Sequence, residues 1–423
     1  MEDRLQAAER YIDEHRGALL ALLQDLVAFR TEAPPARNAA GAQAYVARYL
    51  QELGLVTDVW DVFPGDPNVV GVRRGDPRKH SLLINGHIDV AEVGEGHGWT
   101  RDPFTCVLES GRVYGRGTAD MKGGLAAALF ALRALADAGV PTGGDVIFES
   151  VVGEEQGEAG TRSCNERGYR ADFGLVPDTS GLAIQGQGGV ITGWITIQSP
   201  RTFHDGMRSR LIHAGGGVRG FSAIEKMAKV IQALGDLERY WAVTRAYPGI
   251  PPGSNTINPA VIEGGRHPAF VADRCALWIT VHFHPDQTYQ EVTREIEEHV
   301  LAAAQADPWL REHPPTFRWG GRSMIEDRGE IFPALPLPAD HPATRLLVAA
   351  HEQVVGRPPE LGMSRTVTDA GWLGDAGIPA VIYGPGELDH AHAVDESCDF
   401  EQIVQAAKVY ARFIATWTNT DRP

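Results

Sequence analysis

A glycine-rich stretch at residues 115–124, GRGTADMKGG, carries a single carboxylate, Asp120, and runs directly into an apolar segment. That segment, 125–138, consists of strong helix formers with apolar side chains at helical spacing. The pattern predicts a helix with Asp120 at or just before its N-terminus. A carboxylate at that place can cap free backbone amides, or it can bind a cation if the chain brings other ligands to it.

Apolar runs alternate with helical patterns along the first part of the chain. The runs at 81–90, 145–152 and 174–176 are apolar nearly throughout, as expected for a sheet that helices cover on both faces. Residues 3–30 are expected to form one amphipathic helix. We therefore expect an α/β domain that begins with residues 1–184 and places ligands at its strand ends. The candidate ligands at such ends are His87, Asp89, Glu154, Glu155 and Asp178, with His392 at a similar point near the C-terminus.

The pattern changes at residues 185–189, a glycine-rich hinge. A β-α-β-β-α order follows, which is typical of a ferredoxin-like α+β unit. We expect an inserted lid domain at 185–305 and the second part of the catalytic domain at 306–423. The expected elements of the lid are strands at 190–197 and 275–283, helices at 221–237 and 289–304, and a long Pro/Gly/Asn-rich connection at 247–268.

Composition excludes several classes of protein. The chain has 423 residues and a formal charge of −16 without a basic cluster, so nucleic acid is not an expected partner. Its four cysteines are scattered without metal-ligand spacing, which indicates free thiols in a reducing compartment. No apolar run approaches the about 18 residues that a membrane span needs. We expect a cytoplasmic protein without membrane contact.

Histidines and carboxylates without cysteine suit a hydrolytic metal such as zinc, cobalt or manganese. Two divalent ions about 3.5 to 4 Å apart need a ligand that touches both, and a carboxylate with two oxygens can do so. Asp120 is the candidate bridge. His87 and Asp178 would complete the site of one ion, and Glu155 and His392 the site of the other.

A metal-bound water would be the nucleophile of such a centre, and a base must move its proton to the leaving group. Glu154 suits that role because consecutive side chains diverge in an extended segment, so Glu155 can bind metal while Glu154 faces the water. Asp89 is expected to orient the ring of His87 by accepting its other N–H. Each of these groups alone also has a structural explanation, such as a helix cap, a buried pair or a solvated surface. Their order and their places at strand ends favour the metal centre.

The same residues carry a resemblance to a known family. The chain resembles the metallopeptidases that include acetylornithine deacetylase, succinyl-diaminopimelate desuccinylase, aminoacylase and glutamate carboxypeptidase. The resemblance implies a zinc-peptidase α/β/α domain interrupted by a ferredoxin-like lid that forms a homodimer. It also implies a cis peptide at Asp120–Met121, Glu154 as general base, and His213 at the substrate oxyanion across the dimer. The matching stretches are 86–90, 115–124, 153–155, 177–178, 368–369, 377–379, 384–386 and 391–396.

Three positions depart from that family's pattern. Asp178 stands where its deacylases mostly carry Glu, and Asp is commoner there among the aminopeptidase-like relatives. His282 replaces a carboxylate-binding Arg, and Ala269 replaces an Asn beside the site. Arg365 or Arg274 could bind a carboxylate instead.

The sequence thus predicts a dinuclear-metal amidohydrolase that removes an acyl group from a small N-acylated amine or amino acid. The main expectation is an activity like acetylornithine deacetylase or succinyl-diaminopimelate desuccinylase. The alternatives are a dipeptidase or aminopeptidase, the N-formyl aminopyrimidine deformylase of thiamine salvage, and a metal-free binding scaffold. The expected partners are a small N-acyl substrate and a second copy of the chain.

Overall fold

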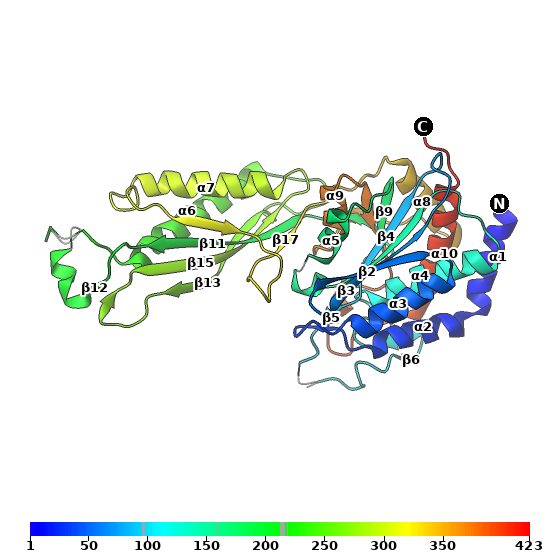
Figure 1. Ribbon diagram of the computed structural model, residues 1–423. Coiled ribbons are helices and arrows are strands. Elements are labelled where there is room, and N and C mark those ends of the chain that lie inside the picture. Colours follow the sequence, from blue (N-terminus) through cyan, green and yellow to red (C-terminus); the bar gives the residue numbers. More distant parts are fainter. Residues whose placement is uncertain (95–97, 158, 212–215, 218) are drawn as a thin grey trace. The chain divides into compact units, whose positions relative to one another are not determined.

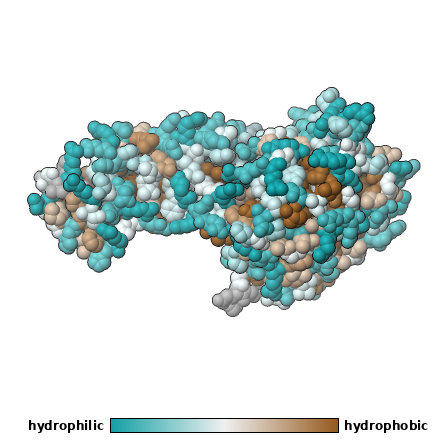
Figure 2. All heavy atoms as spheres, in the orientation of Figure 1, coloured by the Kyte–Doolittle hydropathy of each residue, from teal (hydrophilic) through white to brown (hydrophobic). Residues whose placement is uncertain are grey.

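The computed structural model describes residues 1–94, 98–157, 159–211, 216–217 and 219–423. They form two compact units, one of residues 1–187 and 335–423 and the other of residues 188–334 (Figure 1). Within the described residues, every helix is too short or too polar to cross a lipid bilayer. On the face shown in Figure 2, hydrophilic residues predominate and hydrophobic ones gather in small groups.

An eight-stranded sheet forms the centre of the first unit, in the order β18-β10-β19-β9-β4-β8-β3-β2. Strands β19, β9, β4 and β8 run parallel, whereas β3 and β2 continue the sheet antiparallel. The strands are β2 (Val56–Phe63), β3 (Asp66–Arg73), β4 (Leu82–His87), β8 (Val146–Val151), β9 (Phe173–Val176), β10 (Ile184–Gly186), β18 (Leu361–Met363) and β19 (Ala380–Ile382).

Helices cover both faces of this sheet (Figure 1). Leu82 and Ile84 of β4 pack into the larger apolar cluster, which the helices on one face complete, while Leu83 packs into a separate cluster on the other face. The apolar runs therefore belong to strands that are buried on both sides, as predicted. The larger cluster involves α1 (Glu2–Glu14), α2 (Arg16–Ala28), α3 (Ala40–Glu52), α4 (Lys122–Asp137), α8 (Pro342–Val355) and α10 (Phe400–Thr418), and the opposite face carries α5 (Gly160–Glu166) and α9 (Ala370–Asp375).

The single helix expected at 3–30 is two helices, α1 and α2, which break at His15. The ring of His15 stacks on Tyr11 and its Nδ1 lies 2.8 Å from the carbonyl oxygen of that residue. Short pairings complete the unit: β1 (Glu32–Ala33) with β5 (Val90–Ala91), and β6 (Val107–Glu109) with β7 (Arg112–Tyr114) and β20 (Ser397–Asp399).

The parallel strands determine where the candidate ligands meet. β9, β4 and β8 are neighbours that point the same way, so their carboxyl ends lie at one edge of the sheet. β4 ends at His87, β8 is followed by the short 3-10 helix η1 (Glu154–Gln156), and β9 is followed by Asp178. α4 begins at Lys122, so Asp120 lies just before its first turn, as predicted.

The second unit is an antiparallel sheet in the order β13-β15-β11-β16, with β17 also paired to β11. Two helices pack against the sheet and complete its apolar cluster (Figure 1). The expected ferredoxin-like α+β unit is therefore present. Its elements are β11 (Gly189–Gln198), β12 (Phe203–His204), η2 (Asp205–Arg210), α6 (Ala223–Thr244), β13 (Thr256–Gly264), β14 (Phe270–Val271), β15 (Arg274–Phe283), α7 (Tyr289–Gln305), β16 (Thr316–Trp319) and β17 (Ile331–Phe332).

Two expectations about this unit were wrong. The connection at 247–268 contains β13, which tolerates Pro259 because it lies at the edge of the sheet and has a register shift between Pro259 and Val261. The inserted unit also ends at 334 rather than at 305, because β16 and β17 return to pair with β11 before the chain rejoins the first unit.

Candidate metal centre

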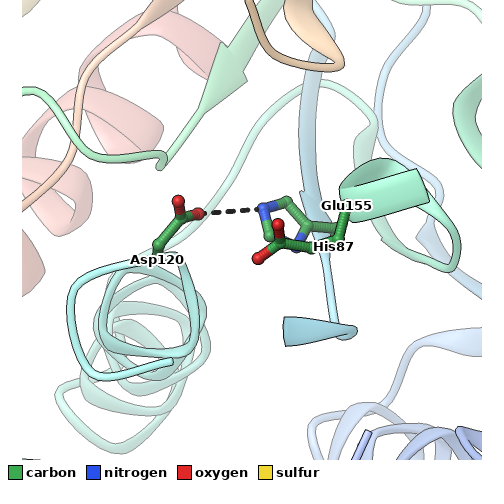
Figure 3. A group of neighbouring side chains, drawn as sticks. All are labelled: His87, Asp120 and Glu155. Carbon is green, nitrogen blue, oxygen red and sulfur yellow. Dashed lines mark ion pairs between the residues drawn. The ribbon is translucent and has the colours of Figure 1, made fainter. Parts of the chain in front are cut away.

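His87, Asp120 and Glu155 form a compact group of potential metal ligands (Figure 3). One ligand atom from each lies within 4.8 Å of the others. His87 extends from the end of β4 and its Nε2 faces Asp120 at 3.2 Å from Oδ1. Glu155 extends from η1 toward the same space, and its Oε1 also accepts a hydrogen bond from the backbone N–H of Ala91 at 2.7 Å.

Asp120 directs its two oxygens at two different histidines. Its Oδ1 faces His87, and its Oδ2 lies 3.3 Å from Nε2 of His392. The same Nε2 lies 2.8 Å from Oε2 of Glu155. Two ligands of one tetrahedral zinc ion, each about 2.0 Å from it, would be about 3.3 Å apart. The spacing on either side of Asp120 therefore fits a carboxylate shared by two ions.

The hydrogen bonding of His87 fits metal binding through Nε2. Its Nδ1 lies 3.0 Å from the backbone oxygen of Asp89, which can only accept, so Nδ1 donates a proton to that oxygen. Nε2 is buried and faces carboxylate oxygens of Asp120 and Glu154. Burial lowers the pKa of this ring, but Asp120 and then Glu154 raise it well above the ordinary value, and a metal ion at Nε2 would replace the proton that these acids attract.

The electrostatics of the group point in the same direction. Hydrogen bonds to Asp120 and then to Glu155 raise the pKa of His392 to about 11. Without metal, the positive charge that balances these two acids is therefore a proton on His392. Burial, followed by the charge of Asp120, raises the pKa of Asp178 to about 7. Carboxylates outnumber imidazoles at this edge of the sheet, and bound cations would supply the missing positive charge.

Glu154 lies beside this group without joining it. Its Oε2 is 3.9 Å from Nε2 of His87, and burial, together with Glu155 and other nearby acids, raises its pKa well above the usual value. The expected extended segment is instead η1, which the left-handed Gly153 opens. The two glutamates still diverge, because Glu155 contacts His392 while Glu154 faces His87.

The expected contact between the carboxylate of Asp89 and the ring of His87 is not the main one. The backbone oxygen of Asp89 takes the ring N–H, and its Oδ1 is 3.8 Å away from Nδ1. The carboxylate instead accepts hydrogen bonds from the backbone N–H groups of Gly153 at 2.9 Å and Glu155 at 3.0 Å. Asp89 thus orients His87 through its main chain and the turn of η1 through its side chain.

The remaining predicted positions belong to the second unit, line a hollow beside Asp178 or fall outside the described residues. His213 falls outside the described residues. Arg274 and His282 are at opposite ends of β15, eight residues or about 26 Å apart, so Arg274 cannot replace a group expected near His282. Arg365 lines a hollow of about 350 Å³, and Thr179, the residue after Asp178, lines the same hollow. The cis peptide expected at Asp120–Met121 is present.

Two buried residues at the site were not predicted from the sequence. Arg116 and Glu396 form an ion pair of 2.7 Å behind Asp120. Glu396 belongs to the stretch 391–396 that carries the family resemblance, and Arg116 lies within 115–124, but nothing in the residue pattern shows that the two meet.

Comparison with known proteins identifies the family. The model of peptidase family M20/M25/M40 matches residues 83–416. N-formyl-4-amino-5-aminomethyl-2-methylpyrimidine deformylase of Halalkalibacterium halodurans is 57% identical over 409 residues, which cover 96% of each chain. The enzyme of the same name from Bacillus subtilis is 54% identical over 99% of this chain and 98% of its own. Acetylornithine deacetylase of Proteus mirabilis is 29% identical over 79% of this chain and 78% of its own.

Solved structures show the same fold at low sequence identity. A metallo-carboxypeptidase of this family from Sulfolobus solfataricus has a TM-score of 0.72 at 18% identity and covers 95% of this chain and 99% of its own. Human carnosine dipeptidase 1 has a TM-score of 0.66 at 18% identity, with 98% and 99% covered. The expected resemblance and fold are confirmed, and the chain belongs to peptidase family M20/M25/M40.

Proposed function

We propose that the chain is a metal-dependent amide hydrolase that removes the formyl group from N-formyl-4-amino-5-aminomethyl-2-methylpyrimidine. The observation that carries this proposal is the 57% identity, over nearly the whole of both chains, to a deformylase named for that substrate. A second enzyme of that name is 54% identical. The donor set around Asp120 supplies the chemistry that such a hydrolase requires.

The main expectation from the sequence, a deacetylase or desuccinylase of amino acids, is less well supported than this alternative. Acetylornithine deacetylases match at 29% identity and over a smaller share of the chain. The substrate of the deformylase has no carboxylate. This agrees with His282, an imidazole where the family resemblance leads us to expect an arginine fork that clamps a carboxylate.

We assign two divalent ions, zinc in the first instance, to the ligands at the sheet edge. His87 and Asp178 would hold one ion, Glu155 and His392 the other, and Asp120 would contact both. Such ions, when bound, acidify water and polarise an amide carbonyl. The burial of His87 and Glu155 supports this assignment, since a water-poor site strengthens both effects.

Glu154 is the residue we assign to proton transfer. In hydrolysis of the formamide, water adds to the formyl carbon, the carbon–nitrogen bond breaks, and formate and the free amine leave. Glu154 would take a proton from the attacking water and give it to the departing nitrogen. Burial and nearby acids raise its pKa, which suits a group that must hold a proton between these two steps.

We further propose a cytoplasmic homodimer that pairs through the inserted unit. β13 is an edge strand of nine residues whose side chains are mostly exposed, and such an edge can add a strand from a second copy. All four cysteines are free and buried, as expected in a reducing compartment. His213 is proposed to reach the substrate oxyanion of the partner subunit, and His213→Ala would then lower kcat more than it raises KM.

Turnover of a substrate panel tests the function. The chelated protein is reloaded with zinc, cobalt or manganese and assayed with the N-formyl aminopyrimidine, N-acetylornithine, N-succinyl-diaminopimelate and a dipeptide. We expect the highest kcat/KM for the formyl compound and no turnover by the chelated protein. A higher kcat/KM for any other member of the panel would reject the proposed substrate.

The Glu154→Gln variant tests the proposed base. It should keep the metal content of the wild type and lose about 10²- to 10⁴-fold in kcat. Glu14→Gln, an exposed change in α1, is the matched control and should change neither quantity. Normal turnover by Glu154→Gln would place the base elsewhere.

A further inference from the structure

Glu396 is a fully buried carboxylate that binds the loop before α4. Its Oε1 accepts hydrogen bonds from three backbone N–H groups, those of Gly117 at 3.0 Å, Ala119 at 2.9 Å and Asp120 at 3.0 Å. Its Oε2 accepts from Nη1 of Arg116 at 2.7 Å. The carboxylate therefore fixes the main chain of the residue whose side chain faces both His87 and His392.

Arg116 connects the same pair to the segment that carries His392. The side chain of Arg116 is 4% exposed, and its Nη2 donates to the backbone oxygen of His392 at 3.3 Å and to that of Glu92 at 3.3 Å. Nη1 also reaches the backbone oxygen of Ala393 at 3.5 Å. One guanidinium thus holds the segment of His392 and, through Glu396, the loop of Asp120.

His392 depends on such support more than His87 does. The side chain of His392 is 56% exposed, whereas that of His87 is 1% exposed. Packing therefore fixes the ring of His87 but not the ring of His392. The backbone of His392 is left-handed, with φ of 58°, a conformation that a residue with a Cβ adopts only when its surroundings hold it there. The contacts of Arg116 with the main chain at 392–393 provide that restraint.

We propose that Glu396 and Arg116 are positioning residues of the metal centre, which hold Asp120 and His392 at the spacing that two ions require. This inference rests on the function proposed above. It assigns no contact with substrate to either residue. Partners that orient metal ligands from behind typically contribute about 10- to 100-fold to metal affinity or activity.

Glu396→Gln is the variant that separates positioning from general stabilisation. The glutamine keeps one oxygen for the three backbone amides but turns an NH₂ group toward Arg116, so the ion pair is lost. Arg116→Lys keeps the charge but replaces the planar fork with a single ammonium, which cannot reach the several carbonyl groups at once. Both variants should bind zinc and cobalt about 10- to 100-fold more weakly in competition with a chelator, and the visible spectrum of bound cobalt should change.

The matched control is Asp307→Asn in the other unit. Asp307 is 2% exposed and accepts hydrogen bonds from Lys226 at 2.7 Å and from the backbone amides of Trp309 and Leu310. Like Glu396, it is therefore a buried carboxylate whose partners are a cation and backbone amides. Along the sequence it is far from the proposed metal ligands. Asp307→Asn should lower the melting temperature and leave cobalt affinity and spectrum unchanged.

Metal binding by folded Glu396→Gln with wild-type affinity and spectrum would overturn the inference and leave the proposed function intact. A wild-type protein that binds no divalent cation would instead overturn the proposed function. Should neither variant fold, amide hydrogen exchange of the metal-free wild type decides. Slow exchange of the amides of Gly117, Ala119 and Asp120 is expected, because Glu396 accepts their hydrogen bonds without metal. Exchange as fast as in an exposed loop would reject the role.

Discussion

Glu149→Gln should stabilise the metal-free protein, and by more as the pH rises. Glu149 is fully buried in β8, where its Oε2 accepts a hydrogen bond from Nδ2 of Asn85 at 2.9 Å and its Oε1 has no hydrogen-bond partner among the described residues. Burial, and then the charge of Asp369, raises its pKa to about 8 from an ordinary 4.5. The folded protein therefore holds Glu149 protonated at neutral pH, whereas the unfolded chain ionises it.

The sign of the effect follows from this raised pKa. The contribution of Glu149 to stability is fully present below about pH 4.5 and is lost as the pH rises toward 8, because only the unfolded state releases the proton. At about 1.4 kcal/mol per pH unit, the loss is roughly 1 kcal/mol at pH 5 and roughly 3 kcal/mol at pH 7. Glutamine has nearly the shape of the protonated acid, keeps an acceptor for Asn85 and has no proton to release.

Urea denaturation of the chelated wild type and Glu149→Gln at pH 5 and pH 7 measures this difference. The variant should gain about 2 kcal/mol more at pH 7 than at pH 5. Glu14→Gln, an exposed change in the same unit, is the control and should stay within about 0.5 kcal/mol at both pH values. A gain for Glu149→Gln that does not change with pH would show that Glu149 is ionised in the folded protein and would refute the reasoning.

Two further predictions concern the metal centre. Gly124→Ala places a Cβ 1.7 Å from the backbone oxygen of Pro177, so α4 must move away from the segment before Asp178; we expect a loss of about 1 to 3 kcal/mol and weaker metal binding. The matched control is Gly17→Ala in α2, whose added Cβ has no atom of the described residues within 4 Å and should stabilise the protein by about 0.5 to 1 kcal/mol in the same denaturation series. Removal of metal should lower the melting temperature. If the free metal concentration was a thousand times its dissociation constant, the loss corresponds to about 4 kcal/mol of stability. An unchanged melting temperature after chelation would contradict a site formed only in the folded state.

The elements that the sequence predicts best are those with a strong local pattern. β4 and β8 are apolar on both faces, and α4 and α8 have apolar side chains at helical spacing, so their places follow from periodicity alone. The ends of parallel strands meet at one edge, and this is why ligands at the ends of β4, β8 and β9 could be grouped before the fold was known.

The parts that the sequence does not reveal either lack the pattern of a buried strand or depend on pairing between distant segments. β13 has mostly exposed side chains and a proline, so it lacks the pattern of a buried strand. β16 and β17 are short, and only their hydrogen bonds to β11 show that the chain has not yet left the inserted unit. A local pattern does not predict β13 because only its pairing with the neighbouring β15 marks it as a strand, and it does not predict the end of the unit because β16 and β17 pair with a strand more than 100 residues earlier.

Side-chain detail at the site had the same limit. The spacing His87-x-Asp89 predicts a contact between the two residues but does not say which oxygen of Asp89 the ring meets, and the main-chain oxygen is the nearer one. Likewise, the side chains of two adjacent glutamates diverge both in a strand and in a single 3-10 turn. The sequence therefore predicts that Glu154 and Glu155 have different neighbours, as the structure shows, although it predicts an extended segment where η1 is present.

The position of His392 depends on contacts between distant segments and not on the ends of the parallel strands. The other ligands follow from the sheet edge and the start of α4, but His392 is more than 200 residues after Asp178 and belongs to no strand of that sheet. Its segment is tied to the site where β20 pairs with β7, the strand just before the loop of Asp120, and where Glu396 meets Arg116. In the proposed assignment, the C-terminal segment completes the second ion site by binding to the Asp120 loop. A change that loosens this connection should weaken binding of the ion proposed at His392 before binding of the ion proposed at His87.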